Sequence, residues 1–228
     1  MSWGLGECGE LGRIVGPMKD GEAYNLERIV REHITPHPVV FKGGGNRFVR
    51  KVGCGAYHLM VCTVENTGGG GLWASGLNNY GQLGLGDIDN RTELCRIDID
   101  GERVEDVDGG MHHSMCYTKE GGLYAWGRGD SGQLGIKEEC EVGYCEMEPM
   151  TVELPGAKGR VKSIGCGSNH NLVVTTANEV FSWGYGDMLA LGHGKDRDEN
   201  KPRIIKGIEG RVLVVAGGGQ HSAIVVSK

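Results

Sequence analysis

The ten residues Trp126-Gly-Arg-Gly-Asp-Ser-Gly-Gln-Leu-Gly135 decide the fold, because the chain repeats them with variations. We call this pattern the Trp-Gly phrase; its other copies are WGLGECGELG at 3–12, SGLNNYGQLG at 75–84 and WGYGDMLALG at 183–192. A second pattern, Gly-x-x-His, alternates with it and ends at His58, His113, His170 and His221, with spacings of 55, 57 and 51 residues. Two markers that alternate in fixed order indicate a repeat architecture of propeller blades or a solenoid.

Glycine makes up 42 of the 228 residues, against an average usage of ~7%. Because the repeat is regular, this excess predicts tight turns between short strands and not disorder. Gly132 and Gly135 are expected to adopt positive φ angles at such turns, since no Gly-Lys-Ser/Thr sequence accompanies them to hold a phosphate. Trp126 and Trp183 are expected in the core. Trp73 is out of register with them by two residues, which keeps it on the same face of its strand.

The net charge of −6 and the pI near 5.8 argue against nucleic-acid binding through the whole surface. Cys54 and Cys166 occupy the same place in the repeat, and equivalent positions of successive blades lie too far apart for a disulfide, so both are expected to be small buried thiols. Cys140 and Cys145 lack the Cys-x-x-Cys spacing of a zinc site. No signal peptide and no apolar run near 18 residues is visible, so neither a membrane span nor secretion is predicted.

We call the four histidines that end the Gly-x-x-His pattern the framework histidines. An apolar strand candidate follows each of them, and after a turn an aromatic strand candidate follows the first three apolar ones. The apolar candidates are 59–64, 114–118, 171–175 and 222–226; the aromatic ones are 72–74, 123–126 and 180–183. Short strands divided by turn signals at this spacing indicate an all-β fold. The sequence therefore predicts an all-β propeller that is incomplete, with about four blades, and favours an open arc over a closed ring.

The markers organise residues 1–228 as a single repeat domain with one insertion. Within that insertion, residues 22–32 are predicted to be helical, with Pro36 and Pro38 ending the helix. The alternation at 47–52 then predicts a half-buried strand. The predicted parts are a half repeat at 1–12, an inserted loop at 13–47, full repeats at 48–84, 104–135 and 160–192, and a closing half repeat at 211–228.

The paired phrases resemble the repeat of the regulator of chromosome condensation family, the exchange factors for the small GTPase Ran. The resemblance covers nearly the whole chain and is carried above all by the segments 76–84, 109–117 and 211–222. It implies a seven-bladed propeller of which this chain corresponds to the C-terminal four-sevenths. It further implies that the first blades, the basic tail, and the wedge loop and acidic residue that the family inserts against Ran lie outside this chain.

The framework histidines recur in every repeat, so they are interpreted as hydrogen-bonding groups that fix the turn and not as catalysts. The residue before each of them varies; the four are Tyr57, His112, Asn169 and Gln220. A variable polar position at an invariant turn is typical of a recognition surface. A second set of varied polar residues lies inside the Trp-Gly phrase: Glu7, Asn79, Asp130 and Asp187.

The resemblance places four of these positions, or their neighbours, against the GTPase: His112, Asn79, Arg13 and His221. Ordinary exposed-loop chemistry stays the alternative interpretation of His112, Asn79 and Arg13. The predicted partner-binding set is His112, Asn79, Arg13, His221, Asp130, Asp187, Asn169 and Gln220.

The leading functional hypothesis is a segment of a Ran-type guanine nucleotide exchange factor, incomplete in isolation, which binds the GTPase through one loop face and promotes nucleotide release. The alternative is a non-catalytic protein-binding scaffold built from the same repeat. An enzyme would require His112, Asp130 and Asp187 to converge, and no other catalytic set is predicted, because neighbours such as His113 and Ser114 point to opposite faces of a strand. No metal, cofactor, small-molecule substrate or membrane contact is expected.

A basic cluster at Lys42, Arg47, Arg50 and Lys51 is interpreted as part of an exposed strand and not as a nucleosome contact, because the chain as a whole is acidic. Chromatin is expected as a partner only through parts of the family's proteins that precede this segment. The expected location is the nucleus for an exchange factor, or the cytoplasm for a scaffold.

Overall fold

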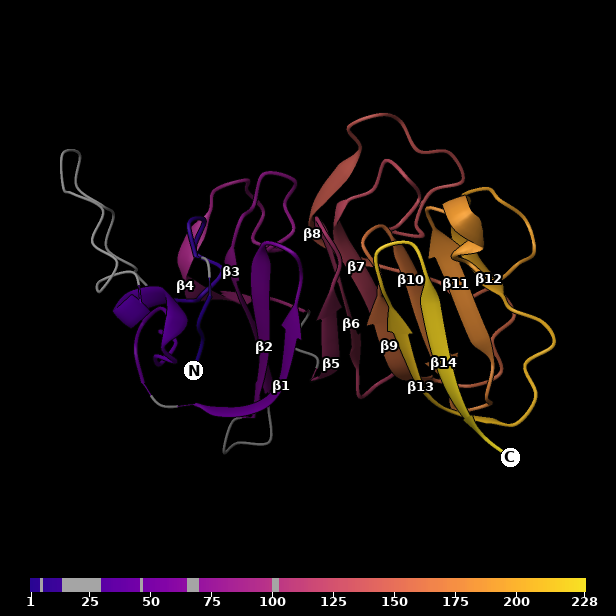
Figure 1. Cartoon of the computed structure of the whole chain (residues 1–228), viewed down its shortest axis with the longest axis horizontal. Helices are drawn as coiled ribbons and strands as arrows, with labels where there is room; N and C mark the ends of the chain where they lie inside the picture. The colour runs from indigo at the N-terminus through magenta and orange to yellow at the C-terminus, as the bar shows by residue number, and fades with distance from the viewer. Residues whose placement is uncertain (5, 14–29, 46, 65–69, 100–102) are drawn as a thin grey trace.

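The chain's short, glycine-bounded apolar runs pair into four antiparallel sheets, which stand side by side in an arc (Figure 1). The computed structural model describes residues 1–4, 6–13, 30–45, 47–64, 70–99 and 103–228. Three sheets have four strands and the last has two. The predicted all-β, incomplete propeller with an open arc is confirmed, and the two chain ends lie on opposite sides of the arc in Figure 1.

Each sheet follows the chain order. The first contains β1 (Phe48–Cys54), β2 (His58–Val64), β3 (Gly70–Gly76) and β4 (Arg91–Ile97). The second contains β5 (Val104–Gly109), β6 (His113–Thr118), β7 (Leu123–Arg128) and β8 (Cys145–Thr151). The third contains β9 (Val161–Cys166), β10 (His170–Thr175), β11 (Val180–Gly184) and β12 (Glu199–Ile204), and the fourth β13 (Arg211–Gly217) and β14 (Ser222–Ser227). We refer to these sheets as blades 1 to 4.

The fourth strand of each complete blade comes after the Trp-Gly phrase, where the sequence pattern predicted no strand. β8 has no buried residue and β12 has only one, so neither carries the alternation of apolar and polar residues that marks a half-buried strand. These strands form because β7 and β11 offer a free edge to pair with. Edge pairing, not an apolar pattern, therefore completes blades 2 and 3, whereas β4 of blade 1 also buries Leu94 and Ile97.

Glycine is required at the second position of the Trp-Gly phrase, because two strands approach each other closely there. Gly127 pairs with His113 across β6 and β7 and has a φ of 96°. A Cβ there would lie 2.5 Å from the carbonyl oxygen of His112. Gly76 and Gly184 occupy the same place in the other two complete blades, so only glycine fits this point of the repeat.

The core consists of layers between successive blades. Trp126 of β7 packs with Met60 and Leu72 of blade 1, and its indole nitrogen donates to the carbonyl oxygen of Gln82 at 2.9 Å. Trp183 donates to the carbonyl of Gln133 at 3.1 Å in the next layer. Both tryptophans are fully buried, as predicted. The predicted positive φ angles are also confirmed, at 75° for Gly132 and 73° for Gly135.

Trp73 is buried as well, on the face of β3 expected from its two-residue offset. Its indole nitrogen donates to Thr63 at 3.1 Å, and Phe41 meets it edge-on with ring centroids 5.2 Å apart. The guanidinium of Arg47 lies 4.1 Å from the centre of the Trp73 ring. The segment before β1 thus caps blade 1 with an aromatic and cationic cluster.

A strand forms in the region predicted at 47–52, but the prediction that it is half-buried is wrong. In β1 the side chains of Val49 and Val52 are 49% and 55% exposed, whereas the equivalent Val104 and Val107 of β5 are each 3% exposed. In the described residues no blade covers this face of β1, so the apolar pattern alone cannot bury it. Cys54, at the end of β1, is exposed for the same reason, against the prediction, while Cys166 is buried as predicted.

Most of the helix predicted at 22–32 lies outside the described residues. A single π-helical turn at Val30–Ile34 is described, and it ends before Pro36. Ser2 then pairs with His37, and Phe41 with Leu94 of β4. In the part of the chain that the structure describes, no helix is long and apolar enough to cross a membrane.

Candidate functional site

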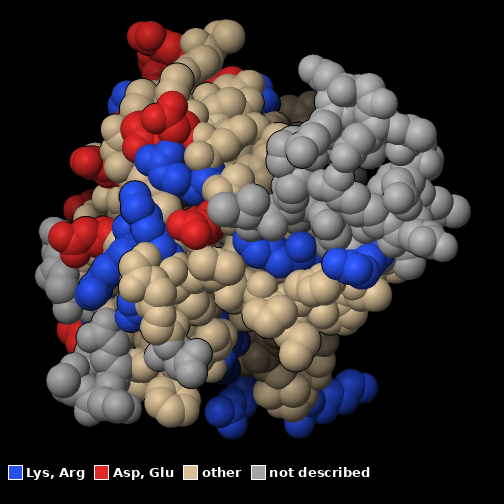
Figure 2. All heavy atoms as spheres, turned by 90° about the vertical axis from the view of Figure 1, so that its left-hand side faces the viewer, with Lys and Arg blue, Asp and Glu red and all other residues tan. Residues whose placement is uncertain are grey.

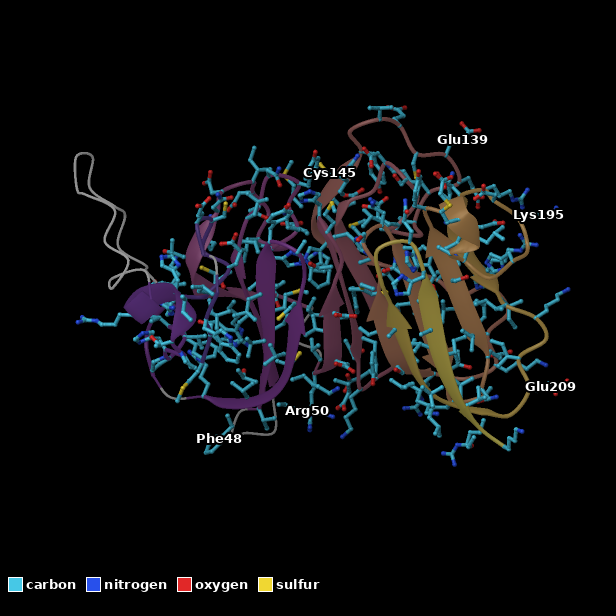
Figure 3. All side chains as sticks on the ribbon, viewed as in Figure 1. Phe48, Arg50, Glu139, Cys145, Lys195 and Glu209 are labelled. Carbon is cyan, nitrogen blue, oxygen red and sulfur yellow. The ribbon has the colours of Figure 1, made fainter. Side chains whose placement is uncertain are left out.

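The Gly-x-x-His turns and the Trp-Gly loops lie at the same end of the sheets, which we call the loop face. Leu77 donates its backbone N–H to Tyr57, Arg128 to His112, and Tyr185 to Asn169, so each Trp-Gly loop begins on a Gly-x-x-His turn. Figure 3 marks this end with Glu139, Cys145 and Lys195 and the opposite end with Phe48, Arg50 and Glu209. All four residues that precede a framework histidine therefore lie on the loop face.

The framework histidines connect neighbouring blades. Nε2 of His58 lies 2.8 Å from the hydroxyl oxygen of Ser114 in blade 2, and that hydroxyl donates to the carbonyl oxygen of Gln82 at 2.7 Å. Because the serine proton is used on Gln82, His58 donates to Ser114 from Nε2. We call this chain of hydrogen bonds a clasp. It joins the Gly-x-x-His turn of blade 1 to strand β6 of blade 2, and that strand to the Trp-Gly loop of blade 1.

The clasp recurs twice with different middle residues. His113 donates to Oδ1 of Asn171 at 2.9 Å, and Asn171 donates to the carbonyl of Gln133 at 2.5 Å. His170 and Ser222 are 3.0 Å apart, and Ser222 donates to a third loop at Ala190. The framework histidines are thus hydrogen-bonding groups, as predicted, but they fix one blade to the next and not only their own turn.

Burial keeps these histidines uncharged at neutral pH. Burial is the largest cause, and with a smaller contribution from neighbouring histidines it lowers the pKa of His58 to about 3 and that of His113 to about 4. The pKa of His170 is also lowered by burial. Uncharged imidazoles with a proton on Nε2 are the form that the clasps need.

The residues before the framework histidines are more accessible than the histidines. Tyr57 and Gln220 are exposed, while His112 and Asn169 are half-buried. The His112 ring stacks on Tyr57, with centroids 5.4 Å apart and planes 14° apart, and Tyr80 lies 4.9 Å away on a tilted plane. His112 therefore belongs to an aromatic cluster that sequence spacing did not predict.

The polar residues of the Trp-Gly phrase are held by partners within the chain. Both carboxylate oxygens of Asp130 accept from Arg128, at 2.7 and 3.0 Å. Asp187 accepts a hydrogen bond from the hydroxyl of Tyr185. Asn79 is exposed and accepts from Gln82 at 3.2 Å. Each keeps a fixed side chain at the loop face, with part of its hydrogen-bonding capacity already used.

Two further predicted residues differ in accessibility. Arg13 is only 8% exposed, so it offers a partner little surface. His221 is exposed and lies with Gln220 at an apolar pocket that Met188 and Leu189 also line. Met188 and Leu189 have positive φ angles of 56° and 61°, at positions where the Trp-Gly phrase at 126–135 has Ser131 and Gly132.

Nothing in the geometry brings together the three residues that an enzyme hypothesis needs. The carboxylate of Asp130 pairs with Arg128, and that of Asp187 accepts from Tyr185. These partners, and not His112, orient the two carboxylates. Across the described ranges, no group of three His, Cys, Asp or Glu side chains is placed to hold a metal ion. The loop face is a set of polar and aromatic groups held by partners within the chain.

Two of the four residues of the basic cluster are paired with acidic residues, while Arg47 packs on Trp73. Arg50 pairs with Glu105, and Lys51 with Asp106 at 3.1 Å, both across to β5. Figure 2, which faces blade 1, shows Lys and Arg groups next to Asp and Glu groups on the left of the view, and Lys and Arg groups without adjacent acidic groups at its lower edge. These pairs leave a mixed surface, in keeping with the interpretation as an exposed strand.

Comparison with known proteins agrees with this arrangement of blades and loops. Residues 1–224 match the RCC1-like domain. The chain belongs to that family. RCC1-like relatives include the regulator of chromosome condensation of Homo sapiens, 33% identical over 98% of this chain and 52% of that protein, and the ultraviolet-B receptor UVR8 of Arabidopsis thaliana, 32% identical over 96% of this chain and 43% of that protein.

Solved RCC1-like structures show the same fold. Prp20p of Saccharomyces cerevisiae superimposes with a TM-score of 0.77 at 26% identity, over 99% of this chain and 51% of that one. The E3 ubiquitin-protein ligase HERC2 of Homo sapiens is another relative, 32% identical over 98% of this chain and 4% of that protein. The chain thus spans about half the length of the first relatives and only a small part of HERC2.

Sequence reasoning found the loop face but missed two of its features. Tyr80 and Arg128 complete the cluster around His112, and Met188 and Leu189 form an apolar pair beside His221. The available signal was departure from the repeat. Arg128 stands where the phrase at 75–84 has Leu77, and Tyr80 where the phrase at 126–135 has Ser131.

Proposed function

We propose that this chain is the segment of a guanine nucleotide exchange factor that binds a small GTPase of the Ran type through the loop face. The observation that carries the proposal is the RCC1-like framework with His112 held among aromatic rings on that face. The proposed contacts are His112, Asn79, His221, Gln220, Asn169, Asp130 and Asp187, with Arg13 restricted by its burial.

Exchange in this proposal needs no covalent chemistry. The loop face accelerates nucleotide release only if it binds the nucleotide-free GTPase more tightly than the nucleotide-bound form. A hundredfold preference corresponds to about 2.7 kcal/mol of differential binding. Clasped turns suit this role, because side chains that are already fixed lose little conformational entropy when the partner binds.

The relatives support the proposal and also its alternative. The solved structure of Prp20p is described together with its binding to Gsp1p and histones. UVR8 and HERC2 are as similar to this chain as the Xenopus laevis regulator of chromosome condensation, each at 32% identity. A non-catalytic scaffold that uses the same loop face for another protein is therefore the second candidate function.

Retention of a nucleotide-free Ran-type GTPase by the immobilised chain tests the proposal. We expect retention, and we expect His112→Ala to weaken it at least tenfold, about 1.4 kcal/mol. Lys119→Ala, in an exposed turn at the opposite end of the sheets, is the control and should bind like the wild type. Absence of retention at micromolar concentration would refute GTPase binding and favour the scaffold.

Release of a fluorescent guanine nucleotide, followed by stopped flow, tests exchange separately from binding. We expect this chain alone to accelerate release weakly, because it spans about half the length of its relatives. A full-length regulator of chromosome condensation is the positive control. Acceleration by the chain equal to that control would contradict the need for further blades.

Nuclear location and chromatin association belong to the same proposal. They rest on the names of the relatives that are regulators of chromosome condensation. The acidic net charge and the paired Arg50 and Lys51 give this segment little means of binding DNA by itself. Chromatin contact is therefore assigned to parts of a longer protein, and a scaffold would be placed in the cytoplasm.

A further inference from the structure

The junction between blades 1 and 2 carries a stack of rings on the loop face. Tyr57, in the turn between β1 and β2, stacks on His112 in the turn between β5 and β6. Tyr80, from the Trp-Gly loop of blade 1, meets the same imidazole at 4.9 Å with a 51° tilt. His112 is thus packed between rings from two different turns or loops of the neighbouring blade.

A cation completes this cluster from the side of blade 2. The guanidinium of Arg128, at the end of β7, lies 5.3 Å from the centre of the Tyr80 ring. The same group makes a bidentate ion pair with Asp130. The backbone N–H of Arg128 donates to the carbonyl oxygen of His112 at 2.9 Å. Arg128 therefore links Tyr80, Asp130 and the backbone of His112.

We propose that Tyr80, Arg128 and Asp130 are positioning residues that fix the His112 imidazole in one orientation for partner binding. This inference rests on the proposed function, because it assigns His112 to the partner contact. Tyr80 and Arg128 act through His112 and need no contact of their own with the partner, while Asp130, itself a proposed contact, also holds Arg128 in place.

The next blade junction shows that the framework does not need such a cluster. There the residues equivalent to His112 and Tyr80 are Asn169 and Ser131, and Tyr185 replaces Arg128. The clasp of His113 with Asn171 forms at that junction all the same. The rings and the cation between blades 1 and 2 are therefore additional to what blade packing requires.

The environment of the imidazole leaves one nitrogen for a partner. Nδ1 of His112 is buried and has no hydrogen-bond partner in the described part of the chain. Nε2 then remains as the ring atom that can bond a partner group. Rotation of the ring would exchange the two nitrogens, and Tyr57 and Tyr80 oppose it by packing on the ring.

Charges around the ring favour its neutral form. Burial lowers the pKa of His112, and the positive charge of Arg128 lowers it further. The titratable and charged groups that face this imidazole or its immediate neighbours are Tyr57, His58 and Tyr80 of blade 1 and His113, Arg128 and Asp130 of blade 2. Arg128 is the cation that acts directly on His112.

The decisive variants are Tyr80→Ser, which installs the residue of the next repeat, and Arg128→Met, which keeps length but removes the charge. Tyr80→Phe keeps the ring and serves as the conservative rescue. Arg91→Met is the matched control, because Arg91 also pairs with an aspartate on a loop, Asp87, without contacting His112. Unfolding midpoints of all four variants establish that each is folded.

The first measurement is the NMR titration of His112 in the whole chain, which needs no partner. We expect Arg128→Met to raise the pKa of His112, because a nearby positive charge is removed. Tyr80→Ser should also raise it, because the ring becomes more exposed to water, and Tyr80→Phe and Arg91→Met should leave it unchanged. An unchanged titration in both Tyr80→Ser and Arg128→Met would overturn the inference, whether or not a GTPase binds.

The second measurement is affinity for the nucleotide-free Ran-type GTPase. We expect Tyr80→Ser and Arg128→Met each to weaken binding about tenfold, with Tyr80→Phe within twofold of the wild type. Added to His112→Ala, Tyr80→Ser should cause no further loss, because it acts through the imidazole. Fully additive losses would refute positioning, whereas loss of binding to every form of the chain would refute only the proposed function.

Discussion

His112 and His113 are neighbours in one turn, yet they serve two different regions of the molecule. His113 is fully buried between blades and donates to Asn171, while His112 is half-buried on the loop face and its ring packs against Tyr57 and Tyr80. The framework position at the blade interface is therefore histidine in every repeat, whereas the preceding position, on the loop face, differs from repeat to repeat. The comparison shows how a repeat protein separates stability from recognition within adjacent positions.

The largest test of the difference is removal of a tryptophan from a blade interface. Trp126→Ala should lower the free energy of unfolding by about 3–5 kcal/mol, because it removes a fully buried indole and its bond to Gln82. Urea unfolding followed by circular dichroism measures the loss. Trp3→Ala, at a site 60% exposed, is the control and should change stability by less than about 0.5 kcal/mol. Equal losses of unfolding free energy in the two variants would show that the blade interface does not stabilise the fold more than the exposed surface does.

Acid should weaken the clasps before it affects most carboxylates. The folded-state pKa values of His58, about 3, and of His113, about 4, lie below the ordinary value of 6.5. Between these values the unfolded chain binds more protons, so stability is complete above about pH 6.5 and falls as the pH falls. We expect a loss of roughly 2 kcal/mol per histidine between pH 7 and 5.

Urea unfolding at several pH values measures this loss. His113→Asn provides the control, because asparagine cannot titrate and should remove one histidine's share of the pH dependence even though it lowers stability. A free energy of unfolding that stays constant from pH 7 to 5 in the wild type would show that the clasps do not require neutral histidines.

A pair of equivalent valines sharpens the comparison at the level of a single side chain. Val107 is 3% exposed against blade 1, and Val52, at the same place in β1, is 55% exposed. Val107→Ala should cost about 1.5 kcal/mol through the loss of two buried methyl groups, whereas Val52→Ala should cost almost nothing. The difference in urea midpoint between the two variants gives the result, and a larger loss at Val52 would mean that this face is covered in solution.

The smallest effect on stability is expected on the loop face. Gln220→Ala removes an exposed side chain from the turn before His221 and should shift the free energy of unfolding by less than about 0.5 kcal/mol. Thermal unfolding checks the value. A loss above 1 kcal/mol would place Gln220 in the framework and take it out of the recognition set.

Much of the framework was predictable because it repeats. The two phrases located β2, β3, β6, β7, β10 and β11, the buried Trp126 and Trp183, and the positive φ angles of Gly132 and Gly135. The fourth strands β8 and β12 were missed, since pairing with a free edge needs no apolar pattern in the added strand. The burial of β1 was misjudged, since alternation shows that a face can be buried but not that a neighbour covers it.

The candidate site was predictable only as a set of positions. Variation before each framework histidine indicated the loop face, but nothing in the spacing brought Tyr80 and Arg128 to His112. Those residues belong to different blades or different loops, and their contact depends on how two blades pack. The burial of Arg13 was equally unpredictable from spacing, because the neighbouring Gly12 lies against Ser75 and Leu59, which are far along the chain.

The sequence by itself determined the repeat, the strand and turn order within each blade and the residues that occupy equivalent positions, because these follow from local backbone preferences and a regular pattern. Only the tertiary structure decided which equivalent positions meet a neighbour. As a result, His113 forms a clasp with Asn171, Val52 is exposed, and the ring of His112 packs against Tyr57 and Tyr80. The clasp contacts of His58 and His113 between blades join residues 56 and 58 positions apart, and no local rule of the chain specifies them.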